Sequence, residues 1–218
     1  MNLQSSKNLG GIGAILLFVA VLLNLVQPLI GGIVGLIGVI MILVALHGLS
    51  DYYRERGIFT NALYGVLIVI IGMVVVTVVA FTVVLANLYE LISIAYPGWI
   101  PGDWLSLQGM TPDPNAFANF DFANLIPLLA GLAIAAVILY VAIIIATYFI
   151  WRSTKQVSAK STVGLFGTAG LLLFIGAFLT IIVIGFFLMW IAALLLAIAF
   201  FQLKPEQPEA IPPPPPSV

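Results

Sequence analysis

Cysteine is absent from this chain, and charged residues make up only 7% of it. Without cysteine the chain can form no disulfide and can offer no thiolate as a nucleophile or as a ligand for zinc or an iron–sulfur cluster. A soluble domain carries about 25% charged residues, so a chain of 218 residues with so few could not cover a water-exposed surface. The solvent around most of this chain is therefore expected to be lipid.

Charge and metal-ligating side chains are also scarce in ways that exclude particular functions. The net charge of −1 provides no electrostatic basis for binding nucleic acid. A single histidine argues against a haem or transition-metal site, because each histidine must serve as a separate ligand. We find no constellation of catalytic, cofactor-binding or metal-ligating residues, so we expect a protein that is not an enzyme and holds no cofactor.

The chain is instead rich in apolar residues, at 63% with a mean hydropathy of +1.24. Blocks without charged residues cover 8–50, 57–89, 122–151 and 161–203. A membrane-spanning helix needs about 20 apolar residues, so the first and last blocks are each long enough for two spans. Asn24, Gln27 and Pro28 mark the turn in the first block, and 182–185 the break in the last. The sequence predicts an all-α, polytopic membrane protein with helices near 9–26, 29–49, 58–94, 125–151, 163–181 and 184–202.

The positions of the basic residues predict how these helices cross the membrane. Six spans place both termini on one side, together with every Lys and Arg, while the long segment 95–124 on the other side carries only acidic charges. Cytoplasmic loops carry an excess of Lys and Arg, so we expect a multi-pass protein of the cell (plasma) membrane with both termini cytoplasmic. Dividing 57–94 into two spans would put Arg152, Lys155 and Lys160 outside, against this rule. The first segment lacks the small-x-small site of a cleaved signal peptide.

The transmembrane domain is expected to cover 1–203, with 95–124 as an external loop and 204–218 as a disordered, proline-rich cytoplasmic tail. Several aromatic residues of the loop, including Trp99 and Trp104, favour an aromatic belt at the headgroup level over a lid above a pocket.

An internal repeat is visible between the first and last hairpins. Residues 10–23 align without gaps on 166–179, with Gly11 on Gly167 and Phe18 on Phe174, and the second helices align less well, with Gly31 on Gly185. The two hairpins would then be parallel repeats related by an axis along the membrane normal. The alternative is that both hairpins need glycine at close helix contacts.

One polar cluster is a candidate site: His47, Asp51, Arg54 and Glu55. His47 and Asp51 are spaced i,i+4 and share a helix face, which allows either a protonatable pair at a cytoplasmic mouth or a juxtamembrane anchor, and we favour the anchor. A second set consists of small residues at helix-packing spacing. Its members are Gly11, Gly31, Gly35, Gly167 and Gly170. They predict packing within the bundle or, alternatively, a contact with another copy.

Three stretches, Ser5–Leu17, Leu46–Gly65 and Gly164–Leu203, resemble a family of archaeal and bacterial membrane proteins defined only as a domain of unknown function. The resemblance implies a polytopic membrane protein from a prokaryote, and it implies no activity, cofactor or site.

From these features we expect a non-enzymatic integral membrane protein that contacts membrane lipids. It would serve as a structural or accessory subunit of a membrane assembly, as a homo-oligomer or beside other membrane subunits, with no nucleic-acid partner. The alternative is a small channel or transporter for a neutral or apolar solute, which the parallel repeat favours.

Overall fold

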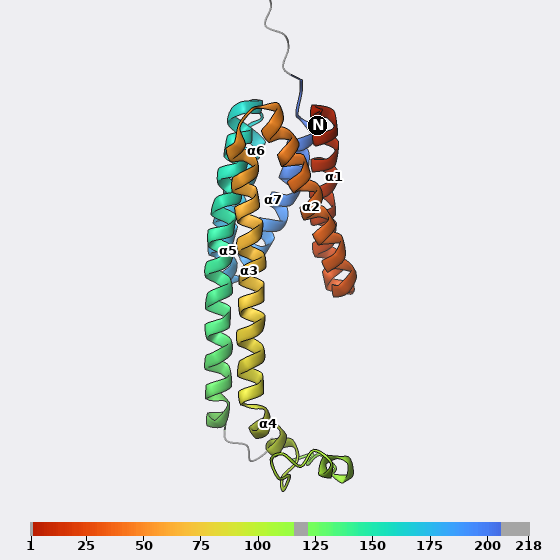
Figure 1. Ribbon diagram of the computed structural model, residues 1–218, viewed down its shortest axis with the longest axis vertical. Coiled ribbons are helices and arrows are strands. Elements are labelled where there is room, and N and C mark those ends of the chain that lie inside the picture. Colours follow the sequence, from red (N-terminus) through yellow and green to blue (C-terminus); the bar gives the residue numbers. More distant parts are fainter. Residues whose placement is uncertain (1, 116–121, 206–218) are drawn as a thin grey trace, which may run out of the picture. The chain divides into compact units, whose positions relative to one another are not determined.

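The computed structural model describes residues 2–115 and 122–205, whose regular elements are all helices (Figure 1). The α-helices are α1 (Leu3–Val26), α2 (Pro28–Tyr52), α3 (Arg56–Ala86), α4 (Leu88–Ala95), α5 (Ile126–Ser161), α6 (Gly164–Leu179) and α7 (Ile184–Phe201), with 3-10 turns η1 (Ser106–Gly109), η2 (Phe122–Leu125) and η3 (Thr180–Ile182). Six helices are long and apolar enough to cross a membrane: α1, α2, α3, α5, α6 together with η3, and α7. The predicted all-α class is confirmed.

The turn inside each hairpin follows from its sequence. Gln27 adopts an extended conformation between α1 and α2, and Pro28 begins α2, where the first residue of a helix needs no N–H partner. In the second hairpin, η3 tightens the end of α6 and Val183 turns the chain with φ 67°. This left-handed conformation is costly for a β-branched residue, so the surrounding helix ends must hold Val183 in it.

Several helix ends differ from the predicted ranges, and α1 begins at Leu3 instead of near residue 9. The predicted helix 58–94 is interrupted at Asn87, whose Nδ2 donates to the Val83 carbonyl at 2.7 Å and so competes for a backbone acceptor. The predicted helix 125–151 continues past Trp151 to Ser161. Hydropathy locates only the apolar part of a span, whereas Arg and Lys favour helix as strongly as Leu does, so the helix extends into the charged segment.

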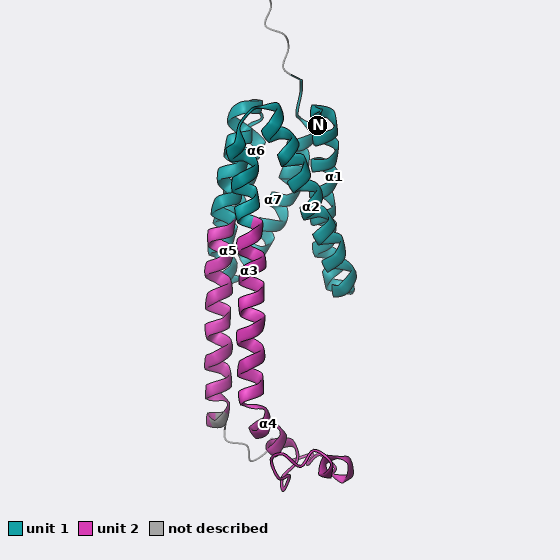
Figure 2. Cartoon of the chain, viewed as in Figure 1, with its two compact units in different colours: residues 1–65, 147–218 teal, residues 66–146 magenta. Residues whose placement is uncertain are grey.

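The chain divides into two compact units, residues 1–65 with 147–218 (unit 1) and residues 66–146 (unit 2) (Figure 2). Unit 1 has one hydrophobic core, made by α1, α2, the first turns of α3, the end of α5, α6 and α7. Its largest fully buried apolar side chains are Leu49, Ile58, Val157, Phe166, Phe200 and Leu203. Phe166 and Phe200 meet edge to face, with ring centroids 5.0 Å apart.

Close helix packing in unit 1 depends on glycine. A Cβ added at Gly38 would lie 2.7 Å from the Gly13 carbonyl oxygen, so α1 and α2 touch backbone to backbone. Gly10 of α1 lies beneath the Phe200 ring of α7, where a Cβ would overlap the ring carbons. Glycine at these positions lets the helix backbones approach closely and brings many atoms into van der Waals contact.

The hairpin turns of the predicted repeat resemble each other in one contact. A Cβ added at Gly31 would lie 2.5 Å from the backbone nitrogen of Asn24, and one added at Gly185 would overlap the backbone nitrogen of Thr180. These glycines are aligned in the repeat, and the register of the first helices also pairs Asn24 with Thr180.

The surroundings of the two hairpins are not equivalent, however. Gly11 faces Phe201 of the other hairpin, whereas Gly167 faces Ser158 of α5. Within the described residues α1 packs on α7, with no comparable contact between α2 and α6. Gly11 and Gly167 therefore do not make equivalent contacts, and the repeat itself stays a prediction.

Unit 2 consists of the remainder of α3 and α5 with α4 and the segment around η1. Gly72 packs on Ala142, and Gly131 packs on Val83, so the two long helices touch through small residues. Most large apolar side chains of this pair are exposed, as at Ile71 with 61%. Trp99 is buried and lies against Trp104 and Tyr89, with centroids 5.3 and 5.8 Å away. The belt interpretation of the loop stays a prediction, and residues 116–121 of it lie outside the described part.

Candidate functional site

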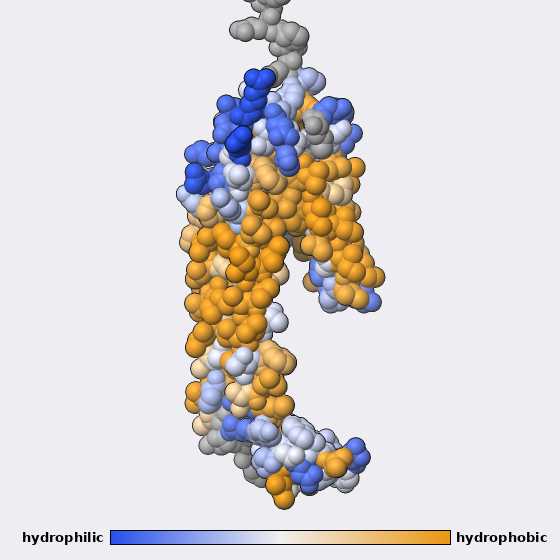
Figure 3. Space-filling view, in the orientation of Figure 1, coloured by the Kyte–Doolittle hydropathy of each residue, from blue (hydrophilic) through white to orange (hydrophobic). Residues whose placement is uncertain are grey.

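The charged residues of unit 1 gather at one end of it, which we name the charged end. All seven Lys and Arg residues belong to unit 1, at the start of α1, the α2–α3 turn, the end of α5 and the end of α7. Figure 3 shows hydrophilic surface at this end of unit 1, followed by a continuous apolar band along its helices.

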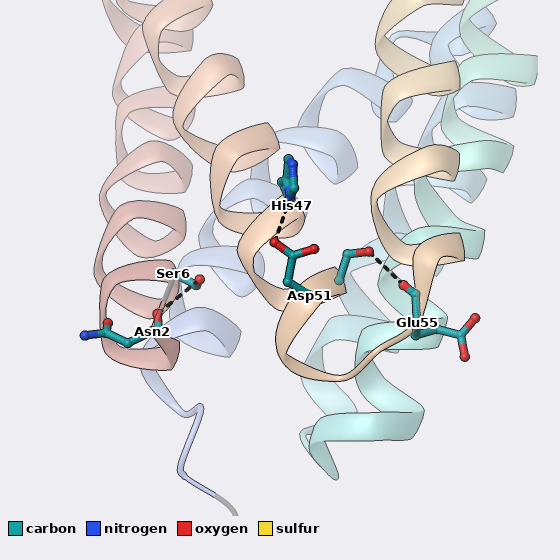
Figure 4. Close-up of polar contacts among 6 residues, drawn as sticks. Asn2, Ser6, His47, Asp51 and Glu55 are labelled. Carbon is teal, nitrogen blue, oxygen red and sulfur yellow. Dashed lines mark hydrogen bonds and ion pairs between the residues drawn. The ribbon is translucent and has the colours of Figure 1, made fainter.

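His47 and Asp51 of the candidate cluster pair on α2 at the charged end (Figure 4). His47 Nδ1 lies 3.3 Å from Asp51 Oδ2, and the imidazole packs against Phe59 with ring centroids 4.7 Å apart. The two side chains are 58% and 60% exposed. An ion pair this exposed contributes about 1 kcal/mol or less, so the pair has the character of a surface anchor at the end of α2.

Arg54 and Glu55 form the turn between α2 and α3 rather than joining the His47–Asp51 pair. Arg54 has φ 53°, and the Glu55 N–H donates to the Ser50 carbonyl at 3.0 Å. Ser50 Oγ donates back to the Glu55 carbonyl at 3.0 Å, which closes the turn (Figure 4). The Glu55 carboxylate lies 3.8 Å from Lys160 Nζ on α5. The carboxylates of Asp51 and Glu55 therefore engage different partners.

A layer of buried polar side chains, which the sequence did not predict, lies just inside the charged end. Ser153 Oγ of α5 donates to the Ile58 carbonyl of α3 at 2.6 Å, and Asn61 Nδ2 donates to the Gly57 carbonyl at 2.7 Å and Gln156 Oε1 at 3.4 Å. The buried polar residues of the described chain are Ser6, Ser50, Asn61, Thr147, Ser153 and Thr154. Only Ser153 and Thr154 carry a signal in the sequence, because they lie between Arg152 and Lys155 of α5.

These buried polar groups are satisfied within the protein. Ser6 Oγ, for example, donates to the Asn2 carbonyl at 3.4 Å (Figure 4). In the described residues no buried side-chain nitrogen or oxygen lacks a hydrogen-bond partner. The layer therefore joins α3 to α5 through side-chain hydrogen bonds.

Near the end of α5, two basic side chains each lie over the ring of the aromatic residue four positions before them. Lys155 Nζ lies 5.5 Å from the centre of the Trp151 ring, and the Arg152 guanidinium lies 6.0 Å from that of Tyr148. These four residues line a groove of about 570 Å³ together with Gln156 and Ala159. Aromatic rings beside cationic heads are typical of the level where a helix leaves the hydrocarbon.

A second groove at the charged end has a volume of about 800 Å³. Lys7, Lys204 and the α5–α6 connection at 161–164 contribute to its lining, along with Leu165, Thr168, Phe201 and Gln202. Lys7 Nζ donates to the Leu203 carbonyl at 3.0 Å, which ties the start of α1 to the end of α7. The sequence analysis did not single out this groove, because its two lysines are separated by nearly the whole chain.

The five candidate packing glycines lie at contacts inside unit 1. Beyond the contacts of Gly11, Gly31 and Gly167 given above, a Cβ at Gly35 would lie 3.4 Å from that of Ala20, and a Cβ at Gly170 would overlap Thr154 Oγ1. They join helices of one chain here. No group of three or more His, Asp or Glu that could hold a metal ion lies within residues 2–115 and 122–205.

Comparison with known proteins identifies relatives of this chain. The model of a family described as "Protein of unknown function (DUF996)" matches residues 34–194. The chain is also 31% identical over 206 residues to "Uncharacterized protein MJ1644" of the archaeon Methanocaldococcus jannaschii, an alignment that covers 94% of this chain and 96% of the relative. No solved structure matches. The chain therefore belongs to the DUF996 family, which confirms the resemblance inferred from the three stretches.

Proposed function

We propose that this DUF996 protein is an integral protein of the cell membrane that crosses the bilayer six times, with both termini in the cytoplasm. We propose further that its role is structural or accessory within a membrane assembly, and not enzymatic. The observation that carries the proposal is the separation in unit 1 between a charged end and a continuous apolar band on the helices (Figure 3).

The apolar helices support the membrane placement. The most apolar 18-residue windows of the six long helices have mean hydropathies between 2.3 and 3.1, and only 6–33% of their residues are buried inside the protein. Burial of apolar surface contributes about 25 cal/mol per Å², so leaving this much of it in water would be strongly unfavourable. Hydrocarbon, or the helices of other subunits, must cover it.

The basic residues support the orientation. The charged end holds every Lys and Arg, and segment 95–115 of unit 2 contains Asp103 and Asp113 and no basic residue. Basic segments remain on the cytoplasmic side during insertion. The charged end therefore corresponds to the cytoplasmic side, where the rings of Tyr148 and Trp151 would lie at headgroup level.

The geometry of the candidate cluster supports a role without catalysis. A catalytic acid–base pair needs groups that converge on a substrate position, whereas His47 and Asp51 are exposed and Glu55 pairs with Lys160. The buried polar layer is satisfied internally. We infer that the polar groups of unit 1 fasten helix ends.

A transporter for a neutral or apolar solute is the second candidate, and one cavity favours it. An almost wholly apolar groove of about 320 Å³ lies between the end of α1 and the start of α7. Its lining comprises Val21, Leu22, Leu25, Val183, Phe186, Phe187 and Trp190. Such a groove suits hydrocarbon and would not replace the hydration of an ion.

Flux through reconstituted protein distinguishes the two candidates. Purified full-length protein in liposomes should pass K⁺, Na⁺, Cl⁻ and glycerol no faster than empty liposomes, as followed by ion-sensitive dyes and by light scattering after an osmotic step. The matched control is protein carrying Gly38→Ala, whose helix packing is altered. Saturable flux of any of these solutes with the wild type, absent from that variant, would replace the structural role with transport.

A further inference from the structure

The groove lined by Lys7 and Lys204 has the composition of an anion-binding site with apolar side chains beside it. Its polar wall contains two ammonium groups, the hydroxyl-bearing residues Ser161, Thr162 and Thr168, and Gln202, while Val163, Leu165 and Phe201 form an apolar wall. The described lining includes no Asp or Glu. Two cations with no carboxylate in the described lining favour an anionic occupant.

Lys7 is held in place at this groove by its own hydrogen bond. Its side chain is half-buried, and Nζ donates to the Leu203 carbonyl at 3.0 Å. An ammonium group has three N–H donors, so this bond leaves donors for a ligand. Because the Lys7 ammonium is already positioned, a ligand that accepts from it loses less conformational freedom than it would on binding a mobile lysine.

The start of α6 adds to the positive potential of the same wall. Gly164 begins this helix of 16 residues, its N-cap Val163 makes no side-chain capping bond, and the first turn carries no acidic residue. The first N–H groups of a helix lack intrahelical partners and carry partial positive charge. They reinforce the two lysines, which supply the full charges.

We propose that this groove binds a phosphate group, held by Lys7 and Lys204. In a phospholipid the phosphate would lie at the lysines and the adjoining acyl chain along Phe201 and Leu165, while a soluble phosphate would occupy the polar wall alone. The apolar wall favours the phospholipid. That assignment rests on the proposed membrane placement, whereas phosphate binding to the lysines does not.

Binding to the full-length protein in a neutral detergent tests the proposal without requiring a membrane orientation. The probes are short-chain phosphatidylglycerol, short-chain phosphatidylcholine and inorganic phosphate, measured by calorimetry or native mass spectrometry. Each lysine near an anionic headgroup adds to the attraction, so wild type should prefer phosphatidylglycerol by about tenfold or more. The variant Lys7→Gln with Lys204→Gln should lose this preference.

The matched control is Arg152→Gln with Lys155→Gln, which removes the same charge from the charged end outside the groove and should retain the preference. Lys7→Arg with Lys204→Arg should retain it as well. Lys204→Gln alone, which leaves the Lys7–Leu203 bond intact, should weaken binding even if the double variant fails to fold. Equal losses in both glutamine pairs, or no preference in the wild type, would overturn the proposal.

The experiment with inorganic phosphate distinguishes a site for soluble phosphate from a site for a phospholipid headgroup. Phosphate that binds with the same lysine dependence and displaces phosphatidylglycerol supports a site for soluble phosphate, and lipid binding that phosphate does not displace supports a phospholipid site. A wrong cytoplasmic orientation would leave the binding results in detergent unchanged. The proposal of phosphate binding and the proposal of membrane orientation therefore fail independently.

Discussion

The Trp190 ring lies flat on the Phe18 ring, with centroids 4.6 Å apart and planes within 8°, and its indole N–H donates to the Phe18 carbonyl at 3.0 Å. One side chain of α7 thus makes both an aromatic and a hydrogen-bonding contact with one residue of α1. The two hairpins, separated by nearly the whole sequence, are joined in unit 1 at this point as well as at the Lys7–Leu203 contact.

Substitution of Trp190 should separate the two parts of this contact. Trp190→Phe keeps an aromatic ring but removes the N–H donor, and should lower the free energy of unfolding by about 1 kcal/mol. Trp190→Ala removes the ring as well and should cost more, about 2–3 kcal/mol, because the apolar contact with Phe18 is lost. Unfolding of the purified protein in detergent, followed by far-UV circular dichroism, measures the change in free energy for both variants. Equal effects of the two substitutions would show that the ring contributes nothing.

Two glycines of α2 should respond to alanine with opposite signs. A Cβ at Gly38 would lie 2.7 Å from the Gly13 carbonyl, whereas one at Gly32 meets nothing within 4 Å. Alanine is a better helix former than glycine by about 1 kcal/mol, so Gly32→Ala should raise the melting temperature. Gly38→Ala must push α1 away from α2 and should lower it. A stable Gly38→Ala protein would contradict the close backbone contact of this hairpin.

His47 should tolerate replacement. Because the His47–Asp51 pair is exposed, His47→Gln and Asp51→Asn should each change the free energy of unfolding by about 1 kcal/mol or less. Yield and elution volume in size-exclusion chromatography should match the wild type. A variant that folds normally but has lost a bound chromophore, seen in the absorbance spectrum of the wild type, would mean that His47 is a ligand and not an anchor.

Single cysteines can report the membrane topology without background, since the chain has none of its own. Gln108 in the segment after α4 and Ala159 near the end of α5 are both exposed. Gln108→Cys should react with a membrane-impermeant maleimide on intact cells, and Ala159→Cys should react only after the membrane is opened. The reverse pattern would exclude six spans with cytoplasmic termini.

The breaks between helices differ in how well the local sequence predicts them. Pro28 after Gln27 predicts the first turn. Proline has no backbone N–H and so cannot extend the preceding helix, but it is favoured at the first position of the next one. Asn87 was a weaker signal, since one amide within a long apolar run either points to solvent or bonds to the preceding turn. Only the structure shows that it bonds to Val83 and interrupts the helix.

The sequence predicts a cluster of four neighbouring residues. In the structure the side chains of His47 and Asp51 pair with each other, whereas Glu55 pairs with Lys160. The i,i+4 spacing of His47 and Asp51 lies within one helix, so its geometry follows from the helical repeat. Glu55 lies beyond the helix end, where the turn decides its direction, and its partner Lys160 comes from a distant part of the chain. Spacing along the sequence cannot predict such a partner.

The all-α class, the six apolar helices and the family can be predicted from the sequence, because helix length and hydropathy are local properties of each segment. The folded chain is needed to see that Trp190 covers Phe18, that Ser153 and Asn61 fasten α3 to α5, and that Lys7 and Lys204 line one groove. The physical reason is that in a chain so uniformly apolar many helix pairings bury similar surface. Close glycine contacts and a few polar side chains that need partners then select among them.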